Sequence, residues 1–268
     1  MIVFVSLLSK HAFLIIAYNQ NTLLQTLINQ IDHPNSDIYI HYDAKFELPN
    51  INTIYSSLYF TDRIAVTWGT FSLVEAELIL FKTALTKHKY EYYHLLSGQD
   101  LLIQPINKIF EYFNKSLNKQ FLDFYLNDKW FNDLGFKSKK TLYELKTQYG
   151  VIHHGSEWCS LTNEAVQIIV DEIDQIKQNF RTIHTADEIY KQTVLFQHKN
   201  LEFNQFGGDG GHKRYIDWSK GGPNPKTFTG NDLQQIINSG MFFARKFSEQ
   251  NMNVVNYIVQ LTTKKDEL

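Results

Sequence analysis

The sequence predicts an α/β protein with a mostly parallel central sheet flanked by helices. Strand-like and helix-like segments alternate through the first half of the chain, which is the order that builds parallel sheets. Polar residues follow several of the strand-like segments directly, at the positions where such sheets bind ligands. The 268 residues are 43% hydrophobic and 15% aromatic, which suffices for a sizeable core.

The expected strands share short apolar runs rich in Ile, Leu and Tyr. They cover residues 11–18, 37–42, 63–68, 92–97 and 121–125. Between them, apolar residues recur at helical spacing over 23–31. A second helix is expected over 72–85, where Ser72 and Glu75 match a capping box, and Pro105 suits the first position of a third.

The second half of the chain is less regular. Over 130–154 the pattern weakens, which indicates a loop-rich insertion, and the glycines of 207–211 indicate a flexible loop. Helical patterns follow at 162–180, from Thr185 onward, and over 232–239. We therefore expect a single domain over 1–268, with one half at about 10–126 and the other at about 127–250.

Charge and cysteine content exclude several classes of protein. The formal net charge is −2 and no long basic run occurs, so no nucleic-acid partner is expected. The densest basic cluster, Lys137, Lys139 and Lys140, fits a solvated loop better than a membrane patch. A single cysteine, Cys159, excludes an internal disulfide and a structural zinc site.

The sequence predicts a cytoplasmic location. It holds no apolar stretch of transmembrane length and no signal-peptide pattern. Residues 265–268 spell the endoplasmic-reticulum retention signal Lys-Asp-Glu-Leu, which we interpret as coincidental because nothing directs the chain into the secretory pathway. Frequent Asn, Ile, Lys and Gln indicate an AT-rich bacterial source.

No metal site and no cofactor are expected. The aspartates never form the Asp-X-Asp tripeptide that holds a divalent cation in many nucleotide-sugar enzymes. The adjacent His153 and His154 would point to opposite sides of an extended chain. A leaving diphosphate would then need protein cations, and Arg245 and Lys246, anchored by the preceding phenylalanines, are the candidates. Their alternative is an ordinary solvated pair.

Polar residues at the strand ends predict a binding cleft. Asn19, Asp43 and Asp100 follow the first, second and fourth expected strands, and the carboxyl ends of parallel strands meet at one edge of a sheet. We expect Asp100 to lie on the rim of this cleft beside Asp43 and to position a sugar or nucleotide. Ordinary loop polarity is the alternative.

Two acidic segments are candidates for chemistry. Thr185 and Glu188 match a capping box, and a carboxylate near a helix N-terminus is held ionised by the helix dipole, which suits a general base. Glu157 could hydrogen-bond sugar hydroxyls and Trp158 could stack on a sugar face. The alternative for this second segment is a helix-entry turn with a core tryptophan.

Several motifs in order resemble the core-2/I-branching enzyme family, which includes β-1,6-N-acetylglucosaminyltransferases and peptide O-xylosyltransferases. The resemblance spans about residues 11–247. The motifs that carry it are Trp68-Gly69 with Ser72-Leu73-Val74, His94-Leu95-Leu96-Ser97-Gly98-Gln99-Asp100 with Pro105, Gly155-Ser156-Glu157-Trp158, Asp187-Glu188, Arg214-Tyr215-Ile216-Asp217-Trp218 and Phe243-Ala244-Arg245-Lys246-Phe247.

This resemblance implies a GT-A type fold, an inverting mechanism and no metal requirement, with a nucleotide-binding first half and an acceptor-binding second half. It makes Glu188 the catalytic base and assigns the leaving diphosphate to Arg245 and Lys246. It also places Asp43 near the nucleotide. Glu157 and Trp158 match positions near the transferred sugar.

The resemblance leaves two points open. Either Arg214 or Lys226 could supply an additional cation for the diphosphate. The xylosyltransferase branch usually has Asp where this chain has Glu157, so GlcNAc and xylose both remain candidates for the transferred sugar. The animal members are membrane-anchored and rich in disulfides, and this chain shows neither feature.

The expected reaction is transfer of a sugar from a UDP-sugar to a hydroxyl of a glycan or lipid-linked glycan. The expected setting is bacterial surface polysaccharide synthesis, with peripheral contact at the inner membrane face. One alternative is a glycoside hydrolase that pairs Glu157 with Glu188. Another is a non-catalytic module that binds a nucleotide sugar or carbohydrate.

Overall fold

The computed structural model describes residues 10–116, 118–125, 139–204 and 210–263. Within these residues the central sheet has five strands in the order β3-β2-β1-β4-β7. Neighbouring strands are parallel except β7, which runs antiparallel to β4. The strands are β1 (His11–Ala17), β2 (Ser36–Tyr42), β3 (Ser57–Phe60), β4 (Tyr92–Ser97) and β7 (Ser160–Thr162). The expected α/β class with a mostly parallel sheet is confirmed.

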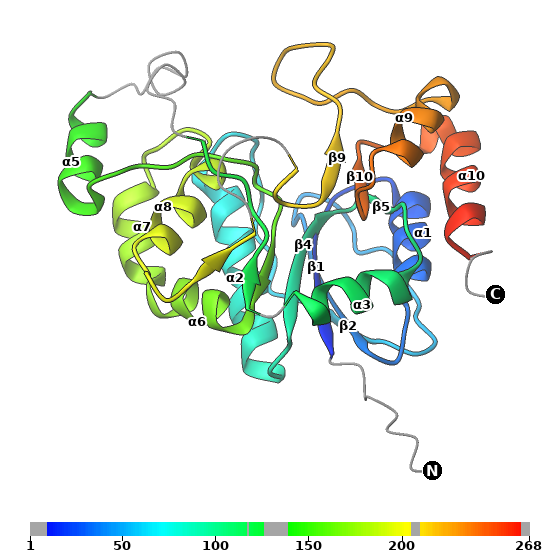
Figure 1. Cartoon of the computed structure of the whole chain (residues 1–268), viewed down its shortest axis with the longest axis horizontal. Helices are drawn as coiled ribbons and strands as arrows, with labels where there is room; N and C mark the ends of the chain where they lie inside the picture. The colour runs from blue at the N-terminus through cyan, green and yellow to red at the C-terminus, as the bar shows by residue number, and fades with distance from the viewer. Residues whose placement is uncertain (1–9, 117, 126–138, 205–209, 264–268) are drawn as a thin grey trace.

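Helices cover both faces of this sheet (Figure 1). Successive side chains of β1 enter opposite cores: Leu14 packs on one side and Ile15 on the other, as the twofold period of a strand requires. The first core is completed by α2 (Phe71–Lys87), α6 (Asn163–Asp171), α7 (Ile173–Phe180) and α8 (Tyr190–Phe196). The second is completed by α1 (Asn21–Ile31), α3 (Ile106–Lys115) and α10 (Met252–Thr263).

A smaller sheet joins the two halves of the chain. In it β10 (Phe243–Arg245) pairs antiparallel with β5 (Leu101–Leu102) and parallel with β9 (Arg214–Ile216). Because β5 follows the end of β4 closely, this pairing brings the last motif of the chain to the carboxyl edge of the central sheet. The remaining elements are β6 (Lys119–Gln120) with β8 (Glu202–Phe203), α9 (Leu233–Asn238), and the short 3-10 helices η2 (Gly230–Asp232) and η3 (Glu249–Asn251).

Two expected strands are wrong. Residues 63–68 form no strand, and β3 lies earlier in the chain. Arg63 in that segment instead donates to the carbonyl oxygens of Tyr42 (2.8 Å) and Asp43 (2.9 Å), which ties the segment to the end of β2. Residues 121–125 contribute only isolated bridges at Phe121 and Tyr125, so β7 takes the place beside β4.

Some expected helix limits also differ. The pattern over 162–180 is divided at Glu172 into α6 and α7, and α5 (Lys139–Tyr149) occupies part of the stretch expected to be irregular. The helix expected from residue 72 begins at Phe71, and Ser72 accepts a hydrogen bond from the Thr67 amide (2.9 Å) in place of a capping box. Pro105 precedes α3 as its N-cap.

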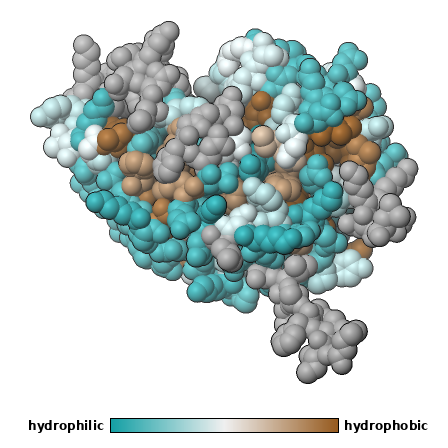
Figure 2. Space-filling model, in the orientation of Figure 1, coloured by the Kyte–Doolittle hydropathy of each residue, from teal (hydrophilic) through white to brown (hydrophobic). Residues whose placement is uncertain are grey.

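The face seen in Figure 2 is mostly hydrophilic in its lower half and carries its apolar surface in the upper half. None of the helices in the described ranges has the length and apolar character needed to cross a bilayer. Lys137, the 265–268 tetrapeptide and most of the glycine segment 207–211 lie outside the described residues.

The double covering of the sheet predicts a large stability cost for a cavity in β1. Ile15 is fully buried, so Ile15→Ala should lower the free energy of unfolding by about 3 kcal/mol in urea denaturation. Ile54 is 84% exposed, and the same substitution there should change stability by less than about 0.5 kcal/mol. Equal effects at the two sites would contradict the placement of β1.

Candidate active site

A cleft of about 790 Å³ lies at the carboxyl edge of the central sheet, where β1 and β4 end. Its floor includes Ile16 and Ser97, the last paired residues of these two strands. The segments that line it are far apart in sequence. They contribute Tyr18, Trp68, Gln99, Asp123, Glu157, Trp158, Asp187, Glu188, His212, Arg214, Trp218, Arg245 and Lys246, among others.

The cleft gathers most of the site residues expected from the sequence, but not all. Those that line it are Glu157, Trp158, Glu188, Arg214, Arg245 and Lys246. Those that do not line it are Asn19, Asp43, Asp100 and Lys226. The expected acidic and basic side chains from distant segments therefore lie in one cleft, while the strand-end residues lie behind or beside it.

Asp100 is fully buried, which differs from its expected place on the rim. Its carboxylate accepts from the Ser97 amide (3.0 Å) and the Ser97 hydroxyl (2.7 Å). One oxygen also lies 3.4 Å from Arg245 Nε, an ion pair without the geometry of a hydrogen bond. Asp100 therefore closes the turn after β4 and orients Arg245 from behind.

Asn19 and Asp43 lie beside the cleft, at the ends of β1 and β2. Asn19 is exposed in the left-handed region (φ 52°), and its side chain accepts from the Gln20 amide. Asp43 is buried and accepts from the Lys45 amide (2.9 Å), with Lys45 Nζ at 3.3 Å. The Asp43 amide donates to Ala17 (2.9 Å), which keeps the two strand ends together.

Arg245 and Lys246 enter the cleft from the end of β10. The Arg245 guanidinium lies 4.1 Å from the centre of the Trp158 ring, a cation–π contact that fixes its plane. Burial lowers the pKa of Lys246, the neighbouring Arg245 charge lowers it further, and Asp100 partly opposes both effects. Two adjacent, partly desolvated cations form a place where an anion would be stabilised.

Glu188 stands on a short turn and not on the helix N-terminus expected from the sequence. The turn is the 3-10 helix η1 (Ala186–Glu188), and Thr185 before it has φ 53° and makes no capping contact. Its hydroxyl donates to the His184 carbonyl instead (2.7 Å). The Gly155 amide donates to the Glu188 carbonyl (2.8 Å) and fixes the turn against the next cleft segment.

The ionisation of Glu188 also differs from the expectation. Burial raises its pKa to about 8, the Asp187 charge adds to this, and Lys191 opposes it. The expected stabilisation by a helix dipole does not occur, because η1 has a single turn and α8 begins only after it. Burial thus disfavours the ionised form of Glu188, which is the form that could act as a base.

Two further carboxyl groups lie beside Glu188. Burial raises the pKa of Glu157 well above its ordinary value, and Asp187 and Glu77 raise it further. The pKa of Asp187 is raised mainly by burial. Glu157 Oε1 and Asp187 Oδ1 have no hydrogen-bond partner among the described residues. Three carboxyl groups, those of Glu157, Asp187 and Glu188, thus line the cleft together.

Both candidates for an additional cation are engaged by other parts of the protein. The fully buried Arg214 donates to the carbonyl oxygens of Leu95 (3.2 Å), Cys159 (2.5 Å) and His212, and to the Ser160 hydroxyl (3.0 Å). This joins β9 to the ends of β4 and β7. Lys226 pairs with Asp232 and, at 3.7 Å, with Asp217, outside the cleft.

Several cleft residues escaped the sequence analysis. His212 Nε2 lies 3.0 Å from Asp123 Oδ2 while its Nδ1 accepts from the Arg214 amide (2.9 Å), so the ring is held in one orientation. Trp68 and Trp218 line the cleft and are 58% and 50% exposed. Both tryptophans belong to motifs that the sequence displays, but exposure at a rim is visible only in the fold.

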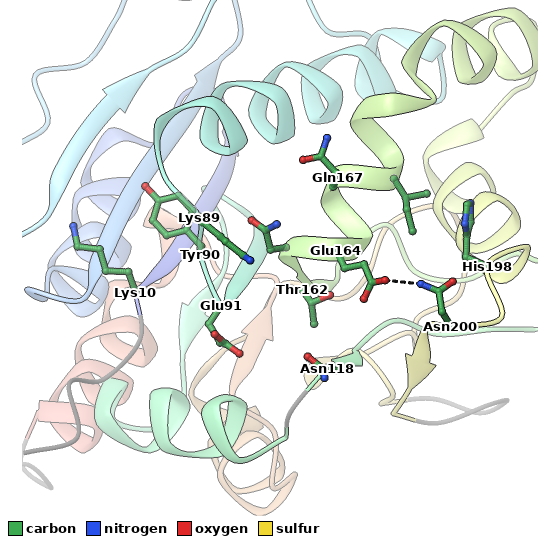
Figure 3. Close-up of a pocket in the computed structure, with 12 residues that line it drawn as sticks. Lys10, Lys89, Tyr90, Glu91, Asn118, Thr162, Glu164, Gln167, His198 and Asn200 are labelled. Atoms are coloured by element: carbon green, nitrogen blue, oxygen red, sulfur yellow. Dashed lines mark hydrogen bonds between the residues drawn. The ribbon is translucent and has the colours of Figure 1, made fainter. Parts of the chain in front are cut away.

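A second depression, of about 850 Å³, lies at the opposite edge of the sheet, where Lys10 and Glu91 precede β1 and β4 (Figure 3). Polar side chains line it, and Glu164 there accepts a hydrogen bond from Asn200. None of the site residues expected from the sequence lines it. The carboxyl-edge cleft is therefore the candidate active site.

A sheet covered on both faces, with carboxyl groups and cations in a cleft at its carboxyl edge, defines an α/β protein whose candidate ligand site lies at the ends of its strands. The chain belongs to the Core-2/I-Branching enzyme family, whose sequence model matches residues 11–241. This match confirms the resemblance that the motifs predicted, and the sheet agrees with a GT-A type fold. No curated protein matches the chain.

Solved structures of two glycosyltransferases are similar to the chain. GlyE of Streptococcus pneumoniae TIGR4 shares 9% sequence identity at a TM-score of 0.47, over 96% of this chain and 65% of GlyE. Mouse xyloside xylosyltransferase 1, in its apo form, shares 10% identity at a TM-score of 0.41, over 88% of this chain and 96% of the mouse chain. The chain thus spans less than two thirds of the GlyE structure.

The raised pKa of Glu188 predicts how stability changes with pH. Between the ordinary glutamate pKa of about 4.3 and about 8, the folded chain holds a proton that the unfolded chain has lost. Stability should therefore fall as pH rises through this window, by up to about 1 kcal/mol per pH unit from this group.

Glu188→Gln removes that contribution, so its urea midpoint should decline less than that of the unmodified chain between pH 5 and 8. Glu164→Gln, at an exposed position, should decline like the unmodified chain. Parallel declines for all three proteins would show that Glu188 titrates normally.

Proposed function

We propose that the chain transfers GlcNAc or xylose from a UDP-sugar to a hydroxyl of a glycan acceptor, with inversion at the anomeric carbon and without a metal ion. One observation carries the proposal: Glu188 and the Arg245–Lys246 pair line the same cleft although they come from distant segments. A proton acceptor and a diphosphate-sized group of cations are the two parts that such a displacement needs.

In the proposed mechanism Glu188 accepts the proton of the acceptor hydroxyl. The hydroxyl oxygen attacks the anomeric carbon as the bond to the diphosphate oxygen breaks on the opposite side of the sugar. Negative charge then grows on the leaving UDP, where Arg245 and Lys246 stabilise it. Asp100 supports this step indirectly, because it holds the Arg245 guanidinium from behind.

The proposed donor lies along the carboxyl edge of the sheet. Its nucleotide is directed toward Asn19 and Asp43, and its sugar toward Glu157 and Trp158. The lining of the cleft supports this direction, since Glu157 and Trp158 lie side by side in it, where the carboxyl group could bond sugar hydroxyls and the ring could contact a sugar face. The exposed rings of Trp68 and Trp218 at the cleft are suited to an acceptor glycan.

Protein cations replace a metal ion in this proposal. No group of three or more His, Cys, Asp or Glu side chains is placed to hold a metal among the described residues. We further propose that the acceptor is an intermediate of bacterial surface polysaccharide synthesis, free or lipid-linked. The enzyme would then act in the cytoplasm, in peripheral contact with the inner membrane face.

Glu188→Gln should reduce transfer about a thousandfold while donor binding survives, because the amide fills the same space but accepts no proton. The measurement is sugar transfer from UDP-GlcNAc and UDP-xylose to an acceptor, with donor affinity measured by calorimetry. Glu164→Gln serves as the exposed control and should transfer normally. Retained turnover in Glu188→Gln would refute the base assignment.

Arg245→Ala with Lys246→Ala should lower turnover at least about a hundredfold, because charge on the leaving diphosphate loses its partners. Lys89→Ala, at an exposed position near the opposite edge, should have no effect. A chelator should leave the unmodified enzyme active. Loss of activity with the chelator would favour a metal-dependent enzyme. Glycan cleavage that needs no nucleotide sugar would favour a hydrolase. Donor binding without any turnover would favour a non-catalytic module.

A further inference from the structure

A fully buried ion pair lies directly behind the cleft. Glu77 on α2 and Lys191 on α8 have no exposed surface, and Lys191 Nζ donates to Glu77 Oε2. The Tyr190 hydroxyl donates to the same oxygen (2.6 Å). A buried pair of this kind is often less stabilising than apolar residues of similar volume, so its presence calls for an explanation other than stability.

The pair is connected to the turn that carries the candidate base. Lys191 Nζ also donates to the backbone carbonyl of Asp187 (3.1 Å), the residue directly before Glu188. One ammonium group therefore joins α2 to η1. A shift of Lys191 would move the turn on which Glu188 stands, although neither Lys191 nor Glu77 lines the cleft.

The positive charge of Lys191 lowers the pKa of the neighbouring carboxyl groups of Glu157, Asp187 and Glu188. Burial is the largest influence on the pKa of Lys191 and lowers it. The attraction of Glu77, Cys159 and Glu157, together with the hydrogen bond to Glu77, raises the pKa overall, so Lys191 remains charged. The groups that face it come from three segments of chain. They are Glu77 on α2, Glu157 and Cys159 on the segment before β7, and Asp187, Glu188 and Tyr190 around the turn.

The charges around Glu188 are otherwise unfavourable to its ionisation. Asp187 raises its pKa, and Lys191 is the group that lowers it. Arg245 lowers the pKa of Glu157, and the exposed His184 lowers the pKa of Asp187. The positive charge behind the turn thus comes from Lys191.

We propose that Lys191, held by Glu77, is a positioning residue: it fixes the Asp187–Glu188 turn and supplies the buried positive charge that favours the ionised, basic form of Glu188. The inference rests on the proposed function of Glu188. It goes further in assigning a role to two residues that touch neither donor nor acceptor. It also explains why an ion pair is retained at a place where apolar side chains would fit.

The test compares Glu77→Gln/Lys191→Met with the unmodified enzyme. This double variant removes both charges together, so no unpaired charge is left buried, and the glutamine still accepts from the Tyr190 hydroxyl. The rising limb of kcat/KM against pH should move to higher pH by about one unit, and the plateau above it should be lower because the hydrogen bond to the Asp187 carbonyl is lost. Donor KM should stay the same, because the cleft lining is unaltered.

Tyr190→Phe is the matched control. It disturbs the same buried contact but keeps both charges, so its limb should stay at the pH of the unmodified enzyme. A folded double variant whose limb does not move, or a Tyr190→Phe limb that moves as far, would overturn the inference and leave only a structural role for the pair.

A readout without catalysis separates this inference from the proposed function. Carboxyl 13C NMR can follow the titration of Glu188, with the signal assigned by its loss in Glu188→Gln. A higher titration midpoint of Glu188 in the double variant supports the inference, whether or not the enzyme transfers sugar. If no sugar is transferred by the unmodified enzyme, only the proposed function is refuted. An unchanged midpoint overturns the inference even in an active enzyme.

Discussion

The site depends on the pairing of β10 with β5. Phe243 stands opposite Leu102, and this register carries the following Arg245 to the end of β4. There its guanidinium meets Asp100 on one side and the Trp158 ring on the other. Without this long-range pairing Arg245 and Lys246 would lie far from the carboxyl groups of the cleft.

The strand register explains why the polar residues concentrate at one edge. Both faces of the central sheet are covered by helices, so charged groups can reach solvent only where the strands end. The carboxyl edge receives the motif segments, while the opposite edge has polar side chains that largely pair with neighbouring residues, such as Lys10 with Asp37. A fold of this class therefore leaves one natural position for chemistry.

Much of the fold was readable from the sequence because its signals are local. Strand β4 was predicted at its observed limits, since a continuous apolar run bounded by polar residues has few other solutions. The strand expected at 63–68 was wrong because the conformation of this segment is not set locally. It depends on the hydrogen bonds that Arg63 donates to the carbonyl oxygens at the end of β2, which is a contact between remote segments. The antiparallel strand β7 could not be predicted for the same reason. Its three residues are too few to show a strand pattern, and they become a strand only by pairing with β4.

The site was predictable in its members but not in their roles. Motifs identified Glu188, Arg245 and Lys246, and the fold brings them into one cleft. Burial, however, cannot be read from a motif, and it is burial that places Asp100 behind Arg245 and raises the pKa of Glu188. Glu77 and Lys191 escaped notice because each looks like an ordinary charged helix residue until α2 and α8 are packed together.

Electrostatic balance links the two ends of the cleft. Burial raises the pKa of Glu157 and Glu188 and lowers the pKa of Lys246, so burial disfavours the charged form at both ends of the cleft. A diphosphate bound at Arg245 and Lys246 would favour the charged form of Lys246 and add negative charge near Glu157, which would then keep its proton and donate it to a sugar hydroxyl. In the proposed mechanism the negative charge that remains resides on Glu188, whose ionised form Lys191 favours. Cations lie in front of the carboxyl groups, at Arg245 and Lys246, and behind them, at Lys191, so the cleft can stabilise negative charge on the base as well as on the leaving group.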